Sequence, residues 1–286
     1  MSVLESWLEE VQANGVKLGL ARMRSALEVL GSPQSSYPSL LVGGTNGKGS
    51  VVTLASALLS AAGHRVGSTL SPHLLEYRER FRLDGRIVES DRLESLAKKL
   101  HAQLHGQPGL GELTFFELGA CLALSLFSED PVGAAVVEVG MGGELDATRA
   151  CEPLVAALVT IDLDHQRYLG ETIQEIARTK ARIAPRGGIL VCTELRPDRL
   201  DVVREEVERA ECTLRLPGQD FEWDFRDGSL SYESNSIRLD AVALRMQGAH
   251  QGLNAACALA AVEALSERAG LKLPDPWKAA GALGGA

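Results

Sequence analysis

The stretch "LLVGGTNGKGSVVTLASALL", residues 40–59, reads as a short apolar strand, a glycine-rich turn and then a helix. Such a turn is typical of phosphate-binding loops with the pattern G-x-x-x-x-G-K-[ST]. In these loops backbone N–H groups surround phosphate oxygens, the lysine neutralises their charge and the hydroxyl binds Mg2+. Gly44, Gly47, Lys48 and Ser50 supply the same parts, but one residue is inserted between the lysine and the hydroxyl. The alternative interpretation is an ordinary glycine-rich turn between a strand and a helix.

The same rhythm of apolar strand, glycine turn and amphipathic helix repeats along the chain and predicts an α/β fold. We expect a mostly parallel sheet of the phosphate-loop type, with helices on both faces. The predicted strands are residues 39–43, 65–70, 133–139, 154–161 and 188–193. The predicted helices are residues 48–62, 91–105, 114–128, 172–183, 198–210 and 250–269.

Two segments depart from this rhythm and predict antiparallel structure. "FRLDGRIV" indicates a β-hairpin, because Asp-Gly separates two alternating stretches. From about residue 212 to residue 246 apolar and polar residues alternate around another Asp-Gly turn. We expect this segment to form a small antiparallel meander added to the edge of the main sheet.

Composition excludes several classes of protein. The chain has 286 residues, of which 45% are hydrophobic, but no unbroken apolar run long enough to span a membrane, so a cytoplasmic enzyme is expected. A net charge of -9 argues against general binding to nucleic acid, which is usually met by a basic face. The five cysteines are widely spaced without a C-x-x-C pair, which supports neither a zinc site nor a disulfide framework.

Polar residues follow three predicted strands, at the edge where open α/β sheets bind ligands. Ser71 precedes Pro72 there, although Ser-Pro is also a common start of a turn. Glu138 interrupts an apolar strand. A buried carboxylate needs a metal, a cation or hydrogen bonds, whereas one on an edge strand would face water. Asp164 and His165 follow the third strand, so His165 can point into the same crevice, although a lone histidine is often structural.

Two helices carry further candidates. Lys180 lies on the predicted helix 172–183, where the ordinary expectation for a lysine is a solvated face. His250, Gln251 and Asn254 lie in the first turn of an otherwise apolar helix. They could bind a ligand or cap the helix, and local sequence favours capping.

Several of these blocks together resemble the folylpolyglutamate synthase and dihydrofolate synthase branch of the Mur ligase family. The similar blocks are "GGTNGKGS", "LSPHL", "FFE", "VEVGMGGELDAT", "LDHQRYLG", the "RTK" before "ARIAP", and "HQGLNAACAL", in the family's order and over nearly the whole chain. The extra residue between Lys48 and Ser50 matches the Mur ligase variant of the phosphate loop. The resemblance implies a ligase with the cofactors ATP and Mg2+. Such a ligase joins glutamate to dihydropteroate or to folates through an acyl phosphate.

The resemblance also implies roles for individual residues. The ATP-binding set would be Gly44, Thr45, Asn46, Gly47, Lys48, Gly49, Ser50 and Asn254, and the catalytic set Lys48, His165 and Lys180. Magnesium would be held by Ser50, Ser71, Glu138, His165 and Lys180, the last as a carbamate, which turns a cation into an anionic ligand. Pterin or folate would contact Ser71, Pro72 and His73.

The same resemblance implies a domain organisation and identifies positions at which this chain differs from the family. We expect an ATP-binding domain over residues 1–270 and, over 271–286, the start of a linker to an absent C-terminal ligase domain. The expected partners are small-molecule substrates, with neither nucleic acid nor membrane. We expect a monomer, with a separate C-terminal domain as a further partner. Glu144 stands where the family usually has arginine, and Arg149 where it has asparagine. The alternative reading is a truncated, catalytically weak ATP-binding module without ligase activity; a small-molecule kinase fits fewer of the blocks.

Overall fold

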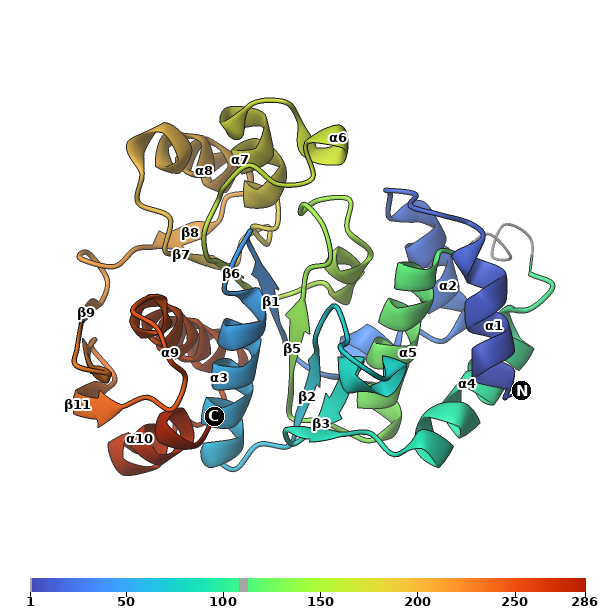
Figure 1. Cartoon of the computed structure of the whole chain (residues 1–286), viewed down its shortest axis with the longest axis horizontal. Helices are drawn as coiled ribbons and strands as arrows, with labels where there is room; N and C mark the ends of the chain where they lie inside the picture. The colour runs from blue at the N-terminus through green and yellow to red at the C-terminus, as the bar shows by residue number, and fades with distance from the viewer. Residues whose placement is uncertain (1, 108–112) are drawn as a thin grey trace.

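Eight strands form one twisted sheet through the middle of the protein (Figure 1). The computed structural model describes residues 2–107 and 113–286. The sheet order is β4-β3-β2-β5-β1-β6-β7-β8, and all neighbours are parallel except in the β2-β3-β4 edge. The strands are β1 (Ser39–Gly43), β2 (Val66–Thr69), β3 (Phe81–Leu83), β4 (Arg86–Ile87), β5 (Ala134–Glu138), β6 (Val155–Leu158), β7 (Ile189–Cys192) and β8 (Thr213–Arg215). The five strands predicted from sequence and the hairpin are therefore confirmed.

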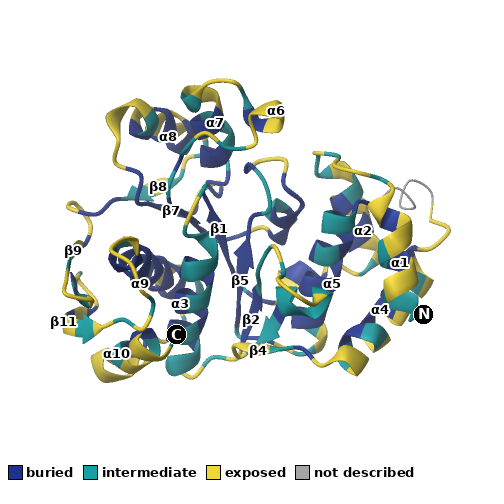
Figure 2. Ribbon diagram, in the orientation of Figure 1, coloured by how far each residue is buried: buried dark blue, intermediate teal, exposed yellow. Residues whose placement is uncertain are grey.

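Helices cover both faces of this sheet, because side chains of successive strand residues point to opposite sides. Leu40 and Val42 of β1 belong to one core, with α3 (Lys48–Ala61), α9 (His250–Ala269) and α10 (Pro276–Gly285). Leu41 belongs to the other core. That core packs the sheet against α1 (Val3–Gln12), α2 (Ala21–Val29), α4 (Ser90–Leu104), α5 (Phe115–Glu129), α7 (Ile173–Ala181) and α8 (Pro197–Arg209). Figure 2 shows the central strands buried between the two layers.

The predicted meander forms, but its position was wrong. Only β8 extends the main sheet, and it runs parallel to β7. The other strands, β9 (Glu222–Arg226), β10 (Ser229–Glu233) and β11 (Arg238–Ala243), form a separate antiparallel sheet that packs against α9 and α10. The reason is the alternating apolar face of these strands, which includes the buried Leu230 and Tyr232 and needs a helix to cover it. Glu263 of α9 fixes the contact by accepting hydrogen bonds from Tyr232 and Ser234.

The end of the described chain is helical and packed. Asp275 caps α10 by accepting a hydrogen bond from the Lys278 N–H at 2.9 Å. Ala279 and Leu283 are buried against the α3 side of the protein. Within the described residues, no helix combines the length and apolar character needed to cross a bilayer.

Gly67 tests the packing between the sheet and α5. A Cβ atom at Gly67 would lie 2.4 Å from the ring of Phe127, which is fully buried. We expect Gly67→Ala to lower the free energy of unfolding by about 1–3 kcal/mol, because the ring cannot move without disturbing the core. Gly281→Ala is the control, since nothing lies within 4 Å of its Cβ position. Urea unfolding of both variants is the measurement, and equal stability of the two would contradict this packing.

Candidate active site

The glycine-rich loop that resembles a phosphate-binding loop, called the phosphate loop below, connects the central strand β1 to the buried helix α3. Gly47 is the N-cap residue of α3 and has a φ of +92°, which an L side chain rarely adopts. In the part of the chain that the structure describes, no side chain caps this helix, so the backbone N–H groups of its first turn remain available to an anion. The loop is held by a 2.6 Å hydrogen bond from the Thr45 N–H to the Thr160 carbonyl. A glycine-rich turn in front of an uncapped helix start is an arrangement that can hold an anion.

Two lysines converge on this loop. Lys48 Nζ donates hydrogen bonds to the carbonyl oxygens of Gly44 at 3.0 Å and Thr45 at 3.2 Å. Lys180 Nζ, from α7, donates to the same Gly44 oxygen at 3.2 Å. Two ammonium groups on one carbonyl repel each other, which favours an anionic ligand between them. Ser50 lies in the first turn of α3, half-buried.

Lys180 is not on a solvated helix face, so that ordinary expectation was wrong. Its side chain is only 3% exposed and lies 3.5 Å from the Asp164 carboxylate. Burial lowers the pKa of Lys180, and the charge of Lys48 lowers it further. A lysine with a lowered pKa has a larger fraction of neutral amine, which is the form that reacts with electrophiles.

Glu138 closes the other side of the loop. It ends β5, where it pairs with Val42 of β1, so the edge-strand interpretation was wrong. The residue is 4% exposed, and its Oε2 accepts a 2.7 Å hydrogen bond from the Ser71 N–H. Burial raises the pKa of Glu138 to about 6, although the Ser71 N–H and the charge of Lys48 oppose the shift. A bound cation would remove this cost of burial.

This pKa shift predicts a dependence of stability on pH. A carboxyl group whose pKa is raised in the folded protein stabilises the fold below its ordinary pKa of 4.5, and the contribution is lost as the pH rises through about 6. The loss amounts to about 2 kcal/mol. In the presence of a chelator, urea unfolding of the wild type and of Glu138→Gln should show this difference across that pH range. Identical pH profiles would contradict the environment described for Glu138.

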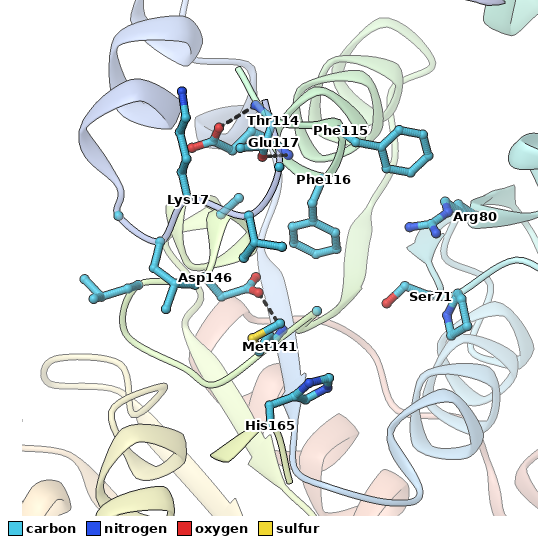
Figure 3. A pocket seen from close by; sticks show the side chains of 18 residues that line it. Lys17, Ser71, Arg80, Thr114, Phe115, Phe116, Glu117, Met141, Asp146 and His165 are labelled. Carbon is cyan, nitrogen blue, oxygen red and sulfur yellow. Dashed lines mark hydrogen bonds between the residues drawn. The ribbon is translucent and has the colours of Figure 1, made fainter. Parts of the chain in front are cut away.

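A cavity of about 330 Å³ opens beside these groups (Figure 3). Ser71 and Arg80 line one side, His165 and Met141 lie on another, and Phe116 points into the space between Asp146 and Ser71. Pro72 also lines the cavity. Further lining comes from residues 15–19, from Thr114, Phe115 and Glu117 in and before α5, and from Gly140, Leu145 and Ala147. The cavity thus has aromatic walls and a few fixed polar groups, as small-molecule sites do.

The carboxylates of this cavity are held in place by hydrogen bonds. Asp146 accepts from the Met141 N–H at 2.8 Å and from the Thr148 N–H at 2.9 Å. Glu117 accepts from the Thr114 N–H at 2.8 Å and pairs with Arg22 at 2.9 Å. Neither carboxylate, nor Arg80, was predicted from sequence as a site residue. They lie far apart in sequence, although "FFE" and "GGELDAT" belong to the quoted blocks.

Of the remaining residues predicted from sequence, His165 lines the cavity, whereas His73 and Asn254 lie outside its described lining. His165 lines the cavity, is 48% exposed, and its Nε2 lies 3.4 Å from Asp164 Oδ1. Among the described residues, His73 is not part of the cavity lining; its Nδ1 accepts a 2.8 Å hydrogen bond from Arg80 Nε. Asn254 is buried, and a Cβ atom on Gly47 would come within 2.5 Å of its Oδ1.

The capping interpretation of the α9 start was wrong. No side chain caps this helix, whose N-cap residue is Ala249. Asn254 Nδ2 instead donates a 3.0 Å hydrogen bond to Gln251 Oε1. The amide therefore lies against the phosphate loop and is available to a ligand there.

Glu144, which stands where the family usually has arginine, has a neighbouring arginine as its ion-pair partner. Glu144 forms a 3.1 Å ion pair with Arg182, at the end of α7. Its carboxylate is about half exposed. The charge reversal at this position is therefore neutralised by a neighbouring guanidinium.

The side chains beside the loop provide some of the oxygen ligands that magnesium needs. Glu138 offers a buried carboxylate whose Oε1 has no hydrogen-bond partner among the described residues, and Ser50 and Ser71 offer hydroxyl groups. Within the same residues, no three side chains of His, Cys, Asp or Glu form a metal site by themselves. Lys180 as an ammonium would repel a cation, whereas a carbamate would complete an oxygen-rich set. The residues therefore fit magnesium when Lys180 supplies an anion.

Comparison with known proteins gives consistent similarities. Residues 90–262 match the Mur ligase middle domain. The dihydrofolate synthase/folylpolyglutamate synthase of Bacillus subtilis (strain 168) is 32% identical over 278 residues, covering 92% of this chain and 63% of that protein. The protein of the same name from Mycobacterium tuberculosis is 35% identical, covering 86% of this chain and 54% of that protein. The chain thus spans less than two thirds of the length of these relatives.

Solved structures agree with these sequence matches. The folylpolyglutamate synthase of Thermotoga maritima superimposes with a TM-score of 0.87 at 32% identity, covering 99% of this chain and 66% of that one. The folylpolyglutamate synthase of Mycobacterium tuberculosis, solved in complex with ADP, gives a TM-score of 0.86 at 30% identity. It covers 98% of this chain and 64% of that one.

Proposed function

Because the chain belongs to the Mur ligase family, we propose that it is an ATP-dependent amide ligase adding L-glutamate to dihydropteroate, to folyl-polyglutamates or to both. The acceptor carboxylate takes the terminal phosphoryl group of ATP, with release of ADP. The amine of glutamate then attacks the acyl phosphate, the amide bond forms and phosphate leaves.

One observation supports this proposal most strongly: two chains of contacts join the cavity to the phosphate loop. Ser71 donates its N–H to Glu138, whose charge interacts with Lys48. On the other side His165 lies beside Asp164, which lies 3.5 Å from Lys180. An acceptor bound in the cavity would therefore present its carboxylate to a phosphoryl group held on the loop.

In this proposal the loop residues bind ATP. Gly44, Thr45, Asn46, Gly47, Gly49 and the first turn of α3 surround the phosphates. Lys48 neutralises the terminal phosphates, as phosphoryl transfer requires. Asn254, which lies against Gly47, contacts the nucleotide. The ATP-binding unit covers residues 1–270.

Magnesium would be held by Ser50, Ser71, Glu138, His165 and carbamylated Lys180. When bound, it supplies positive charge to the transferred phosphoryl group. Carbamylation joins the neutral Lys180 amine to CO2 and releases one proton. The lowered pKa of Lys180 supports this reaction, because it increases the neutral fraction. Burial keeps the carbamate away from bulk water.

The cavity would hold the pterin ring of the acceptor. Phe115 and Phe116 offer faces on which a flat ring can stack. The Asp146 carboxylate can accept hydrogen bonds from the ring's N–H groups. Ser71 and Pro72 would contact the acceptor near the end that reacts. His73 acts through Arg80, which it holds by a hydrogen bond.

The test is acceptor-dependent synthesis by the purified chain. ATP, Mg2+ and labelled glutamate are combined with dihydropteroate in one reaction and tetrahydrofolate in another, and the products are identified by mass. We expect product in at least one reaction, which also names the acceptor. We expect the mass of the protein in solution to be that of one chain. Bound ATP without any product in either reaction would overturn the proposal in favour of an ATP-binding module.

A further inference from the structure

A second cavity, of about 640 Å³, is lined by arginines. Its lining residues come from the start of α2, from the segment that includes η3 (Ala147–Cys151), and from α8 and the end of α7. Its charged lining residues are Arg24, Arg149, Arg182, Arg186 and Arg209 against Glu144 and Glu206. This excess of positive charge contrasts with the net charge of -9 of the whole chain.

Three of these arginines have carboxylate partners. Arg182 pairs with Glu144 and with Glu206, each at 3.1 Å. Arg209 also pairs with Glu206, at 3.2 Å, and Arg186 pairs with an exposed carboxylate outside the cavity lining, at 3.5 Å. Both glutamates of the lining are therefore already engaged by other arginines.

Arg24 and Arg149 differ from the other three. Within the described residues, neither has a carboxylate within 4.0 Å, and the hydrogen bond of Arg149 is a long one, 3.4 Å, to the Ala184 carbonyl. Burial lowers the pKa of Arg149, and the positive charge of Arg24 lowers it further. Glu144 and Glu152 oppose this shift, but only from beyond ion-pair distance. The two guanidinium groups of this cavity therefore repel each other without a close counter-charge, which favours an anion between them.

The start of α2 adds to this positive potential. Its N-cap residue, Leu20, and its first residue, Ala21, both line the cavity. Of the residues that the structure describes, none caps this nine-residue helix with its side chain. Free N–H groups and the helix dipole therefore favour negative charge at this end, in addition to the arginine side chains.

We propose that this cavity binds a small ligand carrying at least two negative charges, as carboxylates or as a phosphate, through Arg24 and Arg149. Guanidinium groups bind both kinds of oxyanion with two parallel hydrogen bonds. The cavity shares no lining residue with the phosphate loop, whereas Leu145 lines both this cavity and the one beside Ser71. A ligand here therefore occupies a site separate from that of ATP. The inference does not depend on ligase activity.

Arg24→Glu is the decisive variant, because it places a carboxylate opposite Arg149. We expect this variant to unfold at a higher temperature than the wild type without any ligand. Arg245→Glu makes the same change in net charge and is the control, since Arg245 is exposed and has no carboxylate partner among the described residues. Arg149→Gln removes the half-buried partner. Because Arg24 is exposed, the Arg24→Glu variant keeps the test valid if Arg149→Gln folds poorly.

Two probes distinguish the source of the anion: inorganic phosphate and γ-linked triglutamate, each titrated while thermal unfolding is followed. All variants carry Lys48→Ala, so that binding at the phosphate loop is reduced. We expect at least one probe to raise the unfolding temperature of the Lys48→Ala protein and of its Arg245→Glu variant. The same probe should bind the Arg24→Glu and Arg149→Gln variants about tenfold more weakly, or more weakly still. The probe that acts identifies the ligand chemistry. Absence of stabilisation by both probes, or equal stabilisation of all variants, would overturn the proposal.

Discussion

Replacing Lys48 by alanine should lower the rate of ATP-dependent glutamate ligation by about 10²–10³-fold. The Lys48 ammonium group lies over the loop, 3.0 Å from the Gly44 oxygen, where the terminal phosphates of ATP would lie. Its charge is needed most when negative charge moves during phosphoryl transfer. We therefore expect the larger effect on kcat, with a smaller effect on the affinity for ATP.

The matched control for this prediction is Lys98→Ala. Lys98 is exposed on α4, and within the described residues its one ion pair is with Glu94, one helical turn away, so its removal should leave the rate unchanged. Steady-state kinetics of both variants, with the unfolding temperature as a check on folding, gives the comparison. Equal rates for Lys48→Ala and Lys98→Ala would remove Lys48 from the proposed chemistry.

Changes at Lys180 should separate a cationic role from an anionic one. We expect Lys180→Met to lose about 100-fold in activity, because it can neither form a carbamate nor position a metal. Lys180→Glu keeps an anion near the same place and should retain more activity than Lys180→Met. Lys180→Arg keeps the positive charge but cannot be carbamylated, and should be as poor as Lys180→Met.

The order of these three variants is the result that decides. Steady-state rates are compared only among variants whose unfolding temperature shows that they are folded under the assay conditions. Mass spectrometry of the intact wild type, prepared with bicarbonate, checks for the carbamate directly. A Lys180→Arg variant more active than Lys180→Glu would show that the ammonium form is the functional one.

The sheet could be predicted from sequence because its signals are local. The central parallel strands β1, β5, β6 and β7 are short runs of mostly apolar residues ended by glycine or by polar residues, and burial on both faces requires this composition. The same was possible for α5, whose start at Thr114 and Glu117 is a capping box. The loop at residues 44–50 could also be located, since its pattern lies in one continuous stretch.

Other features were missed or misplaced because they depend on tertiary contacts. Helices α1 and α2 were not predicted, although Ser2 and Glu5 form a capping box at the start of α1. The meander was assigned to the wrong sheet because alternation indicates a buried face but not its partner. Burial of Lys180 could not be deduced from its helix, because β1 and its loop, far away in sequence, provide the enclosure.

The cavity shows the same limit at the level of the site. Arg80, Phe116 and Asp146 come from three segments that meet only in the folded chain. Each is ordinary in its own stretch, so spacing alone gives no reason to group them. The strand-end residues Ser71, Glu138 and His165 could be grouped, because the carboxyl ends of parallel strands lie at one edge of the sheet.

Transfer of heavy oxygen tests the central claim most directly. The purified chain is incubated with ATP, Mg2+, glutamate and an acceptor whose reacting carboxylate carries 18O. Ligation through an acyl phosphate moves one labelled oxygen from that carboxylate into the released phosphate, together with formation of the glutamyl product. We expect labelled phosphate and product in equal amounts. Product with unlabelled phosphate would contradict the acyl phosphate, and ATP binding without product would contradict the assignment of this chain as a ligase.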